Sequence, residues 1–168
     1  QPAADLRMPL IDQGEFYGEF GSYNVSITLP ENYVVGATGD LQDTAEIRWM
    51  NERAEATLKT IETKTLDYSF PASSQKTKTI RFKQNNIHDF AWFADKRYYV
   101  LKGDVELPAS KHRVETWSLF TQAQSSLWIK APEYLADAIR YYSNQMGDYP
   151  YRQVTAVQGI IGAGGGME

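Results

Sequence analysis

The residues with the clearest chemical potential stand at the end of the sequence, where a glycine run closes on a methionine and a glutamate. The segment reads Gly159-Ile-Ile-Gly-Ala-Gly-Gly-Gly-Met-Glu168. Glycines let a backbone approach another chain closely, because they carry no side chain. The carboxylate of Glu168, placed just beyond them, can receive a cation such as the amino terminus of a peptide. Since folded domains seldom end on such an element, we expect the 168 residues to be a piece of a larger enzyme.

No other pattern in the sequence completes a catalytic site. The two histidines, His88 and His112, are far apart, and neither belongs to an H-E-x-x-H pair, in which two imidazoles would share one face of a helix. No serine lies in a G-x-S-x-G sequence, and no Lys-Ser/Thr follows the glycines at 162–166 as in a phosphate-binding loop. The chain has no cysteine, which excludes disulfides and thiolate zinc sites. We therefore expect neither a complete active site nor a bound metal within these residues.

Composition and charge limit the classes of partner. With 42% hydrophobic and 23% charged residues, the chain can build a core and is not expected to be disordered. The formal net charge of −4 argues against nucleic acid as a partner. The basic residues Lys76, Lys78, Arg81 and Lys83 alternate with other residues and are predicted to lie on a solvated strand face. No apolar run approaches the roughly 20 residues that a membrane helix needs.

Most of the chain has the pattern of short antiparallel strands. Residues 15–29 alternate with period two, and one side of this predicted strand carries Tyr23, Val25, Ile27 and Leu29. Further strands are predicted at 33–38, 79–83, 89–94, 97–102 and 114–120. Short strands at this spacing, with turn residues between them, predict an antiparallel β-sandwich.

One helix is predicted among these strands, over residues 44–63. Its apolar residues recur at intervals of three and four, which is helical spacing. They are Ile47, Met50, Ala54, Leu58 and Ile61. Asp43 or Thr44 can cap the start of this helix, with Glu46 close behind.

The pattern changes class near residues 122–126. A second helix is predicted from about Pro132, where the first helical turn tolerates proline, to Gly147, which favours a stop. Its predicted apolar face consists of Leu135, Ala138, Ile139, Tyr142 and Met146. A turn at 148–151 and a short strand at 153–157 follow. A helix, a turn, a strand and a glycine loop in this order predict the opening of an α/β unit.

Four blocks of sequence, taken in order, point to one family. The first block comprises residues 15–30 with Val35-Gly-Ala-Thr-Gly39, and the second is Ile87-His-Asp-Phe-Ala-Trp92. The third is Tyr141-Tyr-Ser-Asn-Gln-Met-Gly147 with Tyr149-Pro-Tyr151, and the fourth is Gly165-Gly-Met-Glu168. With these blocks the chain resembles the zinc aminopeptidases of the gluzincin type, the group that contains aminopeptidase N and leukotriene-A hydrolase, and above all their bacterial branch. The fourth block is similar to the family's G-x-M-E-N exopeptidase motif, whose fifth residue lies beyond this sequence.

The resemblance implies a division of the chain and a role for its last residues. Residues 1–122 would be the latter part of an N-terminal antiparallel β-sandwich domain with one inserted helix. Residues 123–168 would be the truncated beginning of an α/β thermolysin-like catalytic domain, namely its opening helix and strand. The substrate-binding residues would be Gly165, Gly166, Met167 and Glu168, with the glutamate on the substrate's α-amine and the two glycines along its backbone. The zinc of the intact enzyme would be held by a later H-E-x-x-H and a further glutamate, so this piece would bind none and be inactive alone.

The resemblance also implies partners and a compartment. The partners would be peptides with a free amino terminus and the rest of the catalytic domain, with no nucleic acid and no membrane span. The bacterial branch is often exported, which favours the cell envelope, periplasmic or exported, over the cytoplasm.

Two other functions are consistent with parts of the sequence. One is a non-catalytic β-sandwich module that binds peptide or carbohydrate on a face lined by Phe90, Trp92, Tyr98, Tyr99 and Trp117. Aromatic residues at strand spacing are more often part of a core, and a binding module would not need the last helix or the terminal Gly-Gly-Met-Glu. The other is a family member whose zinc motif has decayed, leaving a scaffold.

Overall fold

The computed structural model describes residues 18–159, which are mainly β-strand with two long helices. The strands are β1 (Gly21–Pro30), β2 (Val34–Ala37), β3 (Asp40–Leu41), β4 (Thr77–Ile87), β5 (Trp92–Asp95), β6 (Tyr99–Glu106), β7 (Arg113–Phe120) and β8 (Gln153–Val157). The helices are α1 (Thr44–Thr63), the short α2 (Ser125–Trp128) and α3 (Ala131–Met146), with a 3-10 turn at Gln122–Gln124. The predicted mainly β class, with one inserted helix and a late helix and strand, is confirmed. The assignment of residues 123–168 to a thermolysin-like domain stays a prediction.

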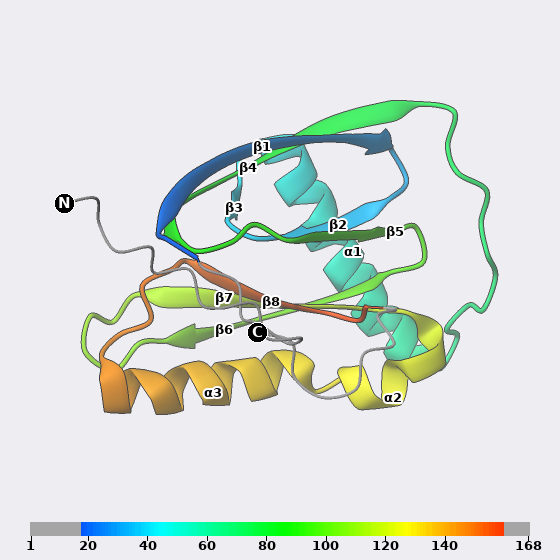
Figure 1. Cartoon of the computed structure of the whole chain (residues 1–168). Coiled ribbons are helices and arrows are strands. Elements are labelled where there is room, and N and C mark those ends of the chain that lie inside the picture. The colour runs from blue at the N-terminus through cyan, green and yellow to red at the C-terminus, as the bar shows by residue number, and fades with distance from the viewer. Residues whose placement is uncertain (1–17, 160–168) are drawn as a thin grey trace, which may run out of the picture.

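The described strands form three small sheets. The first has the order β1-β4-β3 and the second β2-β5, and every pair in them is antiparallel. The third has the order β6-β7-β8, in which β6 is antiparallel and β8 parallel to β7. In Figure 1 the sheets lie one above another, with α3 beneath the third sheet and α1 running from the level of the first sheet down to the third. The parallel pair joins strands on either side of residue 122, so the predicted domain boundary falls within one sheet.

The alternation predicted for the first strand is confirmed over its described part. Ile27 and Leu29 of β1 are buried, while Ser26 and Thr28 between them are exposed. β1 pairs along its length with β4, which is longer than predicted. Lys78 of β4 corrects the prediction of a solvated basic face, because it shares the inner side of this strand with Ile80 and Phe82.

Helix α1 has the predicted bounds, but the face that it buries is rotated from the predicted one. Met50 and Ala54 are buried as expected, whereas Ile47 and Leu58 are exposed. The polar residues Glu46 and Thr57 are buried instead. Glu46 accepts a hydrogen bond from Lys78, and the Thr57 hydroxyl accepts one of 3.1 Å from the Val100 backbone N–H. Asp43 stands at the N-cap position without capping the helix through its side chain, because its carboxylate accepts the Arg81 N–H at 2.7 Å.

Helix α3 likewise buries a different face from the predicted one. Of the expected residues only Ile139 is buried, while Ala138, Tyr142 and Met146 are exposed and Leu135 is half-buried. The buried face consists instead of Pro132, Ala136, Ile139 and Ser143. Small residues suit this face because the helix lies close to β6. A Cβ added to Gly103 of that strand would lie 3.3 Å from the Cβ of Pro132.

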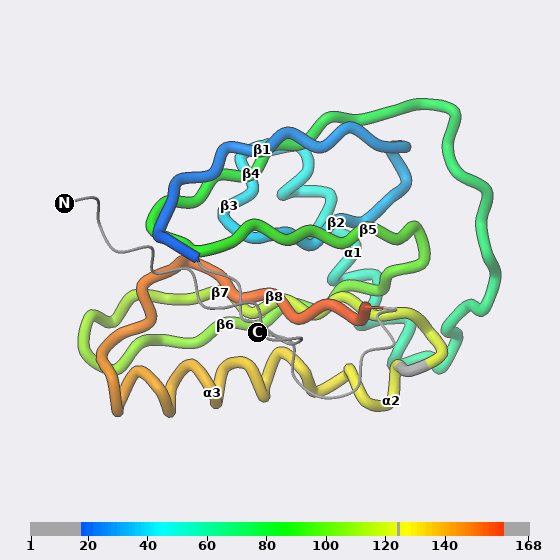
Figure 2. Tube along the Cα trace, viewed as in Figure 1, coloured from blue at the N-terminus to red at the C-terminus, as the bar shows by residue number. Residues whose placement is uncertain are grey.

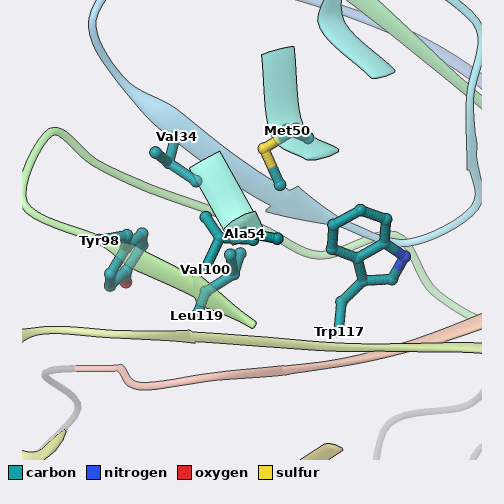
Figure 3. Close-up of a cluster of buried hydrophobic side chains, with 7 residues drawn as sticks. All are labelled: Val34, Met50, Ala54, Tyr98, Val100, Trp117 and Leu119. Carbon is teal, nitrogen blue, oxygen red and sulfur yellow. The ribbon is translucent and has the colours of Figure 1, made fainter. Parts of the chain in front are cut away.

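The main hydrophobic cluster lies between α1, β2 and the third sheet. It consists of Val34, Met50, Ala54, Tyr98, Val100, Trp117 and Leu119, shown in Figure 3. In this view Met50 and Ala54 point from α1 toward Trp117 and Leu119 of β7. A second cluster fills the space between the first two sheets, and a third lies between α3 and the other face of the third sheet. The residues on the two faces of β7 therefore belong to two of the three clusters.

An irregular connection, residues 64–76, leads from the end of α1 back to β4. Figure 2 shows it running along one edge of the molecule, from the level of the third sheet to the first. It is tied at both ends: the Asp67 N–H donates to the Tyr99 hydroxyl at 2.7 Å, and the Asn32 side chain donates to the Ala72 carbonyl at 2.9 Å. The connection therefore contacts both β6 of the third sheet and the turn that follows β1 of the first sheet.

A nearly buried ion pair joins α1 to the first sheet. The Nζ of Lys78 donates to Oε1 of Glu46 at 2.6 Å, and the two side chains are 15% and 9% exposed. The same ammonium lies 3.8 Å from the ring centroid of Trp49, whose π-face attracts it. Burial raises the pKa of Glu46 and lowers that of Lys78, and the bond between them offsets these shifts only in part. Removal from water therefore outweighs the mutual attraction of the two charges.

We expect Lys78→Met to lower the free energy of unfolding by about 3 kcal/mol, because it leaves the Glu46 carboxylate buried without its partner. The double variant Glu46→Met/Lys78→Met should lie within about 1 kcal/mol of the parent protein. Urea unfolding of the parent, both single variants and the double variant measures the coupling. A loss in the double variant equal to the sum of the losses in the two single variants would show that the pair is not coupled.

Gly36 of β2 sets the distance between the second and third sheets. A Cβ at this position would lie 2.5 Å from Cδ1 of Leu119 and 2.8 Å from Cγ2 of Val157. Leu119 has none of its surface exposed and packs in the main hydrophobic cluster, so making room for the added methyl group would disturb the core, and we expect Gly36→Ala to destabilise the protein by about 1–3 kcal/mol. The matched control is Gly21→Ala, whose Cβ would meet no atom closer than 3.5 Å. Thermal unfolding midpoints of the two variants measure the difference, and equal midpoints would contradict the close approach.

Candidate functional site

The four predicted substrate-binding residues, Gly165, Gly166, Met167 and Glu168, lie outside the described residues. What the structure does describe is the strand that leads to them, β8, and its surroundings. β8 follows α3 and is added to the third sheet beside β7, with Gln153 opposite Glu115 and Val157 opposite Leu119. The order of β7, α3 and β8 thus forms a β-α-β unit with a parallel pair of strands.

The end of β8 is fixed by hydrogen bonds through Gln158. Its backbone N–H donates to the Leu119 carbonyl at 2.8 Å, and its own carbonyl accepts the Tyr98 hydroxyl at 2.8 Å. Its side-chain oxygen accepts the Thr121 N–H at 2.7 Å and the Thr121 hydroxyl at 3.2 Å. One glutamine therefore joins β8 to the ends of β6 and β7, and the chain leaves the sheet from a defined point.

β8 is an edge strand among the described strands, because only β7 pairs with it. Its Arg152 carbonyl accepts from the Glu115 N–H, and the Gln158 N–H donates to Leu119. Since backbone groups alternate along a strand, those of Gln153, Thr155 and Val157 face away from β7. An extended peptide could pair with such an edge as an added strand.

A cavity of about 400 Å³ lies at the other end of β8, between β2, β3, α1 and the third sheet. One face of β7 forms part of the cavity wall, and the successive residues on this face are Arg113, Glu115, Trp117 and Leu119. The face is thus charged at one end and apolar at the other. α1 and β2 cover the apolar end, and the cavity extends from there to the charged end.

Four charged side chains line the cavity: Asp40, Arg113, Glu115 and Arg152. Arg113 forms an ion pair with Asp104 of β6, and Glu115 accepts from Lys102 of β6 at 2.6 Å. Burial raises the pKa of Asp40 and Glu115 adds to this effect, whereas Arg152 opposes it. The carboxylate of Asp40 is therefore partly desolvated and lies near one acidic side chain, Glu115, and one basic side chain, Arg152.

A second cavity of about 290 Å³ shares Gln153 with the first cavity, and Tyr149 and Tyr151 are among its other lining residues. Gln153 lines both spaces and joins β8 to the turn after β2, because its side-chain amide donates to the Gly39 carbonyl at 2.8 Å. Nothing in the sequence pattern marked Asp40, Arg152 or Gln153 as site residues. Asp40 follows a turn glycine, Gln153 begins a short strand and Arg152 comes just before it, so only the tertiary structure brings them together.

The histidines do not form a metal site. Nδ1 of His88 lies 3.1 Å from the Gly18 carbonyl oxygen, and its ring packs on Phe20 with a centroid distance of 4.0 Å. His112 lies apart, in the turn that leads into β7. Within residues 18–159, no three side chains of the metal-binding types come together. None of the helices in that range is long and apolar enough to cross a membrane.

The aromatic residues considered for a binding face are divided between core and surface. Tyr98 and Trp117 are buried, and Phe90 and Tyr99 are half-buried, in line with the preference for a core. Trp92 of β5 is the exception, with half of its surface exposed. These residues do not form a shared exposed face.

Comparison with known proteins gives no independent assignment. No protein-family model and no curated protein matches the chain.

We expect Gln158→Ala to lower the free energy of unfolding by about 1–2 kcal/mol, because the Thr121 N–H loses its acceptor in a half-buried position. The control is Gln145→Ala on the exposed side of α3, which should change stability by less than about 0.5 kcal/mol. Urea unfolding followed by circular dichroism measures both values. Equal effects would mean that the Gln158 side chain does not hold the end of β8.

Proposed function

We propose that this chain is part of a zinc-dependent aminopeptidase, to which it contributes the segment that binds the amino end of the substrate. The observation that carries the proposal is the ordered series of four resembling blocks, which ends in Gly165-Gly-Met-Glu168. The position of β8 supports it. The strand that leads into the glycine segment lies at the edge of a sheet, and Gln158 fixes its end.

The proposed role of the last residues follows from their chemistry. A carboxylate in a cleft favours substrates with a free ammonium group and disfavours chains that would leave the carboxylate buried without a partner. Glu168 is the carboxylate that would make this selection. Gly165 and Gly166 would let the substrate backbone approach closely, since a side chain there would stand in its way.

The zinc ion of such an enzyme does not fit the described residues of this chain. His88 is held by Gly18 and Phe20, and no second imidazole lies beside it. The ligands would have to come from other parts of a longer protein. When bound there, the zinc would polarise the scissile carbonyl and activate water.

A second candidate function is a non-catalytic module that binds peptide or carbohydrate. The cavity of about 400 Å³ favours it, because a concave, partly apolar space with a few polar groups is typical of ligand sites. The exposed Trp92 also fits such a role. This candidate does not account for the terminal Gly-Gly-Met-Glu.

We expect Glu168→Gln in the intact enzyme to reduce kcat/KM on a free-amine substrate by about tenfold to a hundredfold, since it removes a charge-assisted hydrogen bond worth about 1.5–3 kcal/mol. Glutamine keeps the shape of the side chain, so the melting temperature should stay the same. The matched control is Glu133→Gln, an exposed carboxylate in the first turn of α3, which should leave kcat/KM unchanged.

Bound zinc, the melting temperature and kcat/KM together distinguish the possible roles of Glu168. Bound zinc is determined in the parent and in both variants, and it should be equal in all three if Glu168 binds substrate rather than metal. A lower melting temperature with unchanged kcat/KM per folded molecule would make Glu168 a structural residue. A full-length protein with neither zinc nor turnover would remove the peptidase proposal and leave the binding module or the decayed scaffold.

A further inference from the structure

Two of the four charged side chains in the larger cavity, those of Asp40 and Arg152, attract each other without direct contact, since Arg152 lowers the pKa that burial raises at Asp40. Arg113 forms an ion pair with Asp104 of β6, and Glu115 forms one with Lys102 of the same strand. The side chains of Asp40 and Arg152, in contrast, make neither an ion pair nor a hydrogen bond within residues 18–159, although both line the same space. The cavity thus presents one carboxylate and one guanidinium that are available to a ligand.

The rest of the lining is apolar and comes from several elements. Leu41 follows Asp40 in β3, Met50 comes from α1, and Phe82 and Trp117 come from β4 and β7. Met50 and Phe82 are buried, so this part of the wall is held in place by the core. At about 400 Å³, the cavity falls within the range of about 300–1,000 Å³ that is usual for small-molecule sites.

We propose that this cavity binds a free α-amino acid with an apolar side chain, whose carboxylate pairs with Arg152 and whose ammonium group pairs with Asp40. The guanidinium of an arginine matches a carboxylate through two parallel hydrogen bonds. The side chain of the ligand lies against Met50 and Phe82. Arg152 is exposed and Asp40 half-buried, so the guanidinium lies nearer the solvent than the carboxylate.

The charges of the lining favour a zwitterion over other ligands. The cavity holds two acidic and two basic side chains, so its charges balance, and a ligand with a net charge would face an unfavourable neighbour at either end. A phosphate group would lie close to both Asp40 and Glu115. A metal ion would find only these two carboxylates among the lining residues, together with two arginines. The proposal does not depend on the peptidase function, because it uses only residues of β2 to β8.

The first test uses the unaltered 168-residue protein and ligands that differ in one charge. Calorimetric titration with L-leucine should give saturable binding with one site per chain. N-acetyl-L-leucine lacks the ammonium group and L-leucinamide lacks the carboxylate, so each should bind at least about tenfold more weakly. L-methionine should bind about as well as L-leucine, whereas L-aspartate should bind more weakly because of its extra charge.

The second test uses variants of the two available charges. Asp40→Asn and Arg152→Gln should each weaken L-leucine binding by at least about tenfold. The matched controls are Asp137→Asn and Arg140→Gln, which alter an exposed ion pair on α3 and should change the affinity by less than about twofold. Circular dichroism confirms that each variant is folded. If a variant does not fold, the titrations of the unaltered protein with the two analogues decide the matter.

Three results would overturn the proposal. One is the absence of saturable L-leucine binding up to about 10 mM. Another is equal affinity for L-leucine and either analogue, which would reveal a site for a single charge or for apolar groups alone. The last is unchanged affinity in both the Asp40 and the Arg152 variants. None of these results bears on Glu168, whose role is tested separately by turnover in the intact enzyme.

Discussion

The described structure depends on the burial of β7 on both of its faces. Val114, Thr116 and Ser118 face α3, while Trp117 and Leu119 face α1 and β2. A strand buried in this way must find partners for its backbone on both edges, because unpaired N–H and C=O groups away from water are costly. β6 supplies one edge and β8 the other. The chain therefore has to cross over through α3 and return in parallel before it reaches the glycine segment.

Close approach between layers is the second constraint, and it comes from small residues. Gly36 lets β2 lie against Leu119 and Val157, and Gly103 lets Pro132 of α3 lie against β6. Neither glycine has a positive φ, so what each position requires is the absence of a side chain and not an unusual backbone conformation. The ion pair between Glu46 and Lys78 is a different kind of contact between α1 and the first sheet, because the cost of taking its two charges out of water offsets much of their attraction.

β8 borders one of the proposed binding sites and precedes the other in the sequence. Its carboxyl end is held by Gln158 and leads toward the predicted substrate-binding residues, while its amino end, with Arg152 and Gln153, borders the larger cavity. The same short strand therefore bears on both proposals, because it leads to the residues proposed to bind a peptide and borders the cavity proposed to bind an amino acid. Gln153 lines both cavities and also donates to the Gly39 carbonyl, so a ligand in either space would lie beside the contact between the second and third sheets.

The sequence alone determined the local elements, because hydrophobic period and turn residues act within a few positions along the chain. The period of three and four residues predicted α1 with its observed bounds, and alternation predicted the inner side of β1. Only the tertiary structure decided which helix face is buried, because Glu46 and Thr57 found partners on β4 and β6, more than 30 positions away in the sequence. It also decided the parallel addition of β8 and the meeting of Asp40 with Arg152, since pairing and charge proximity depend on segments that no local pattern relates.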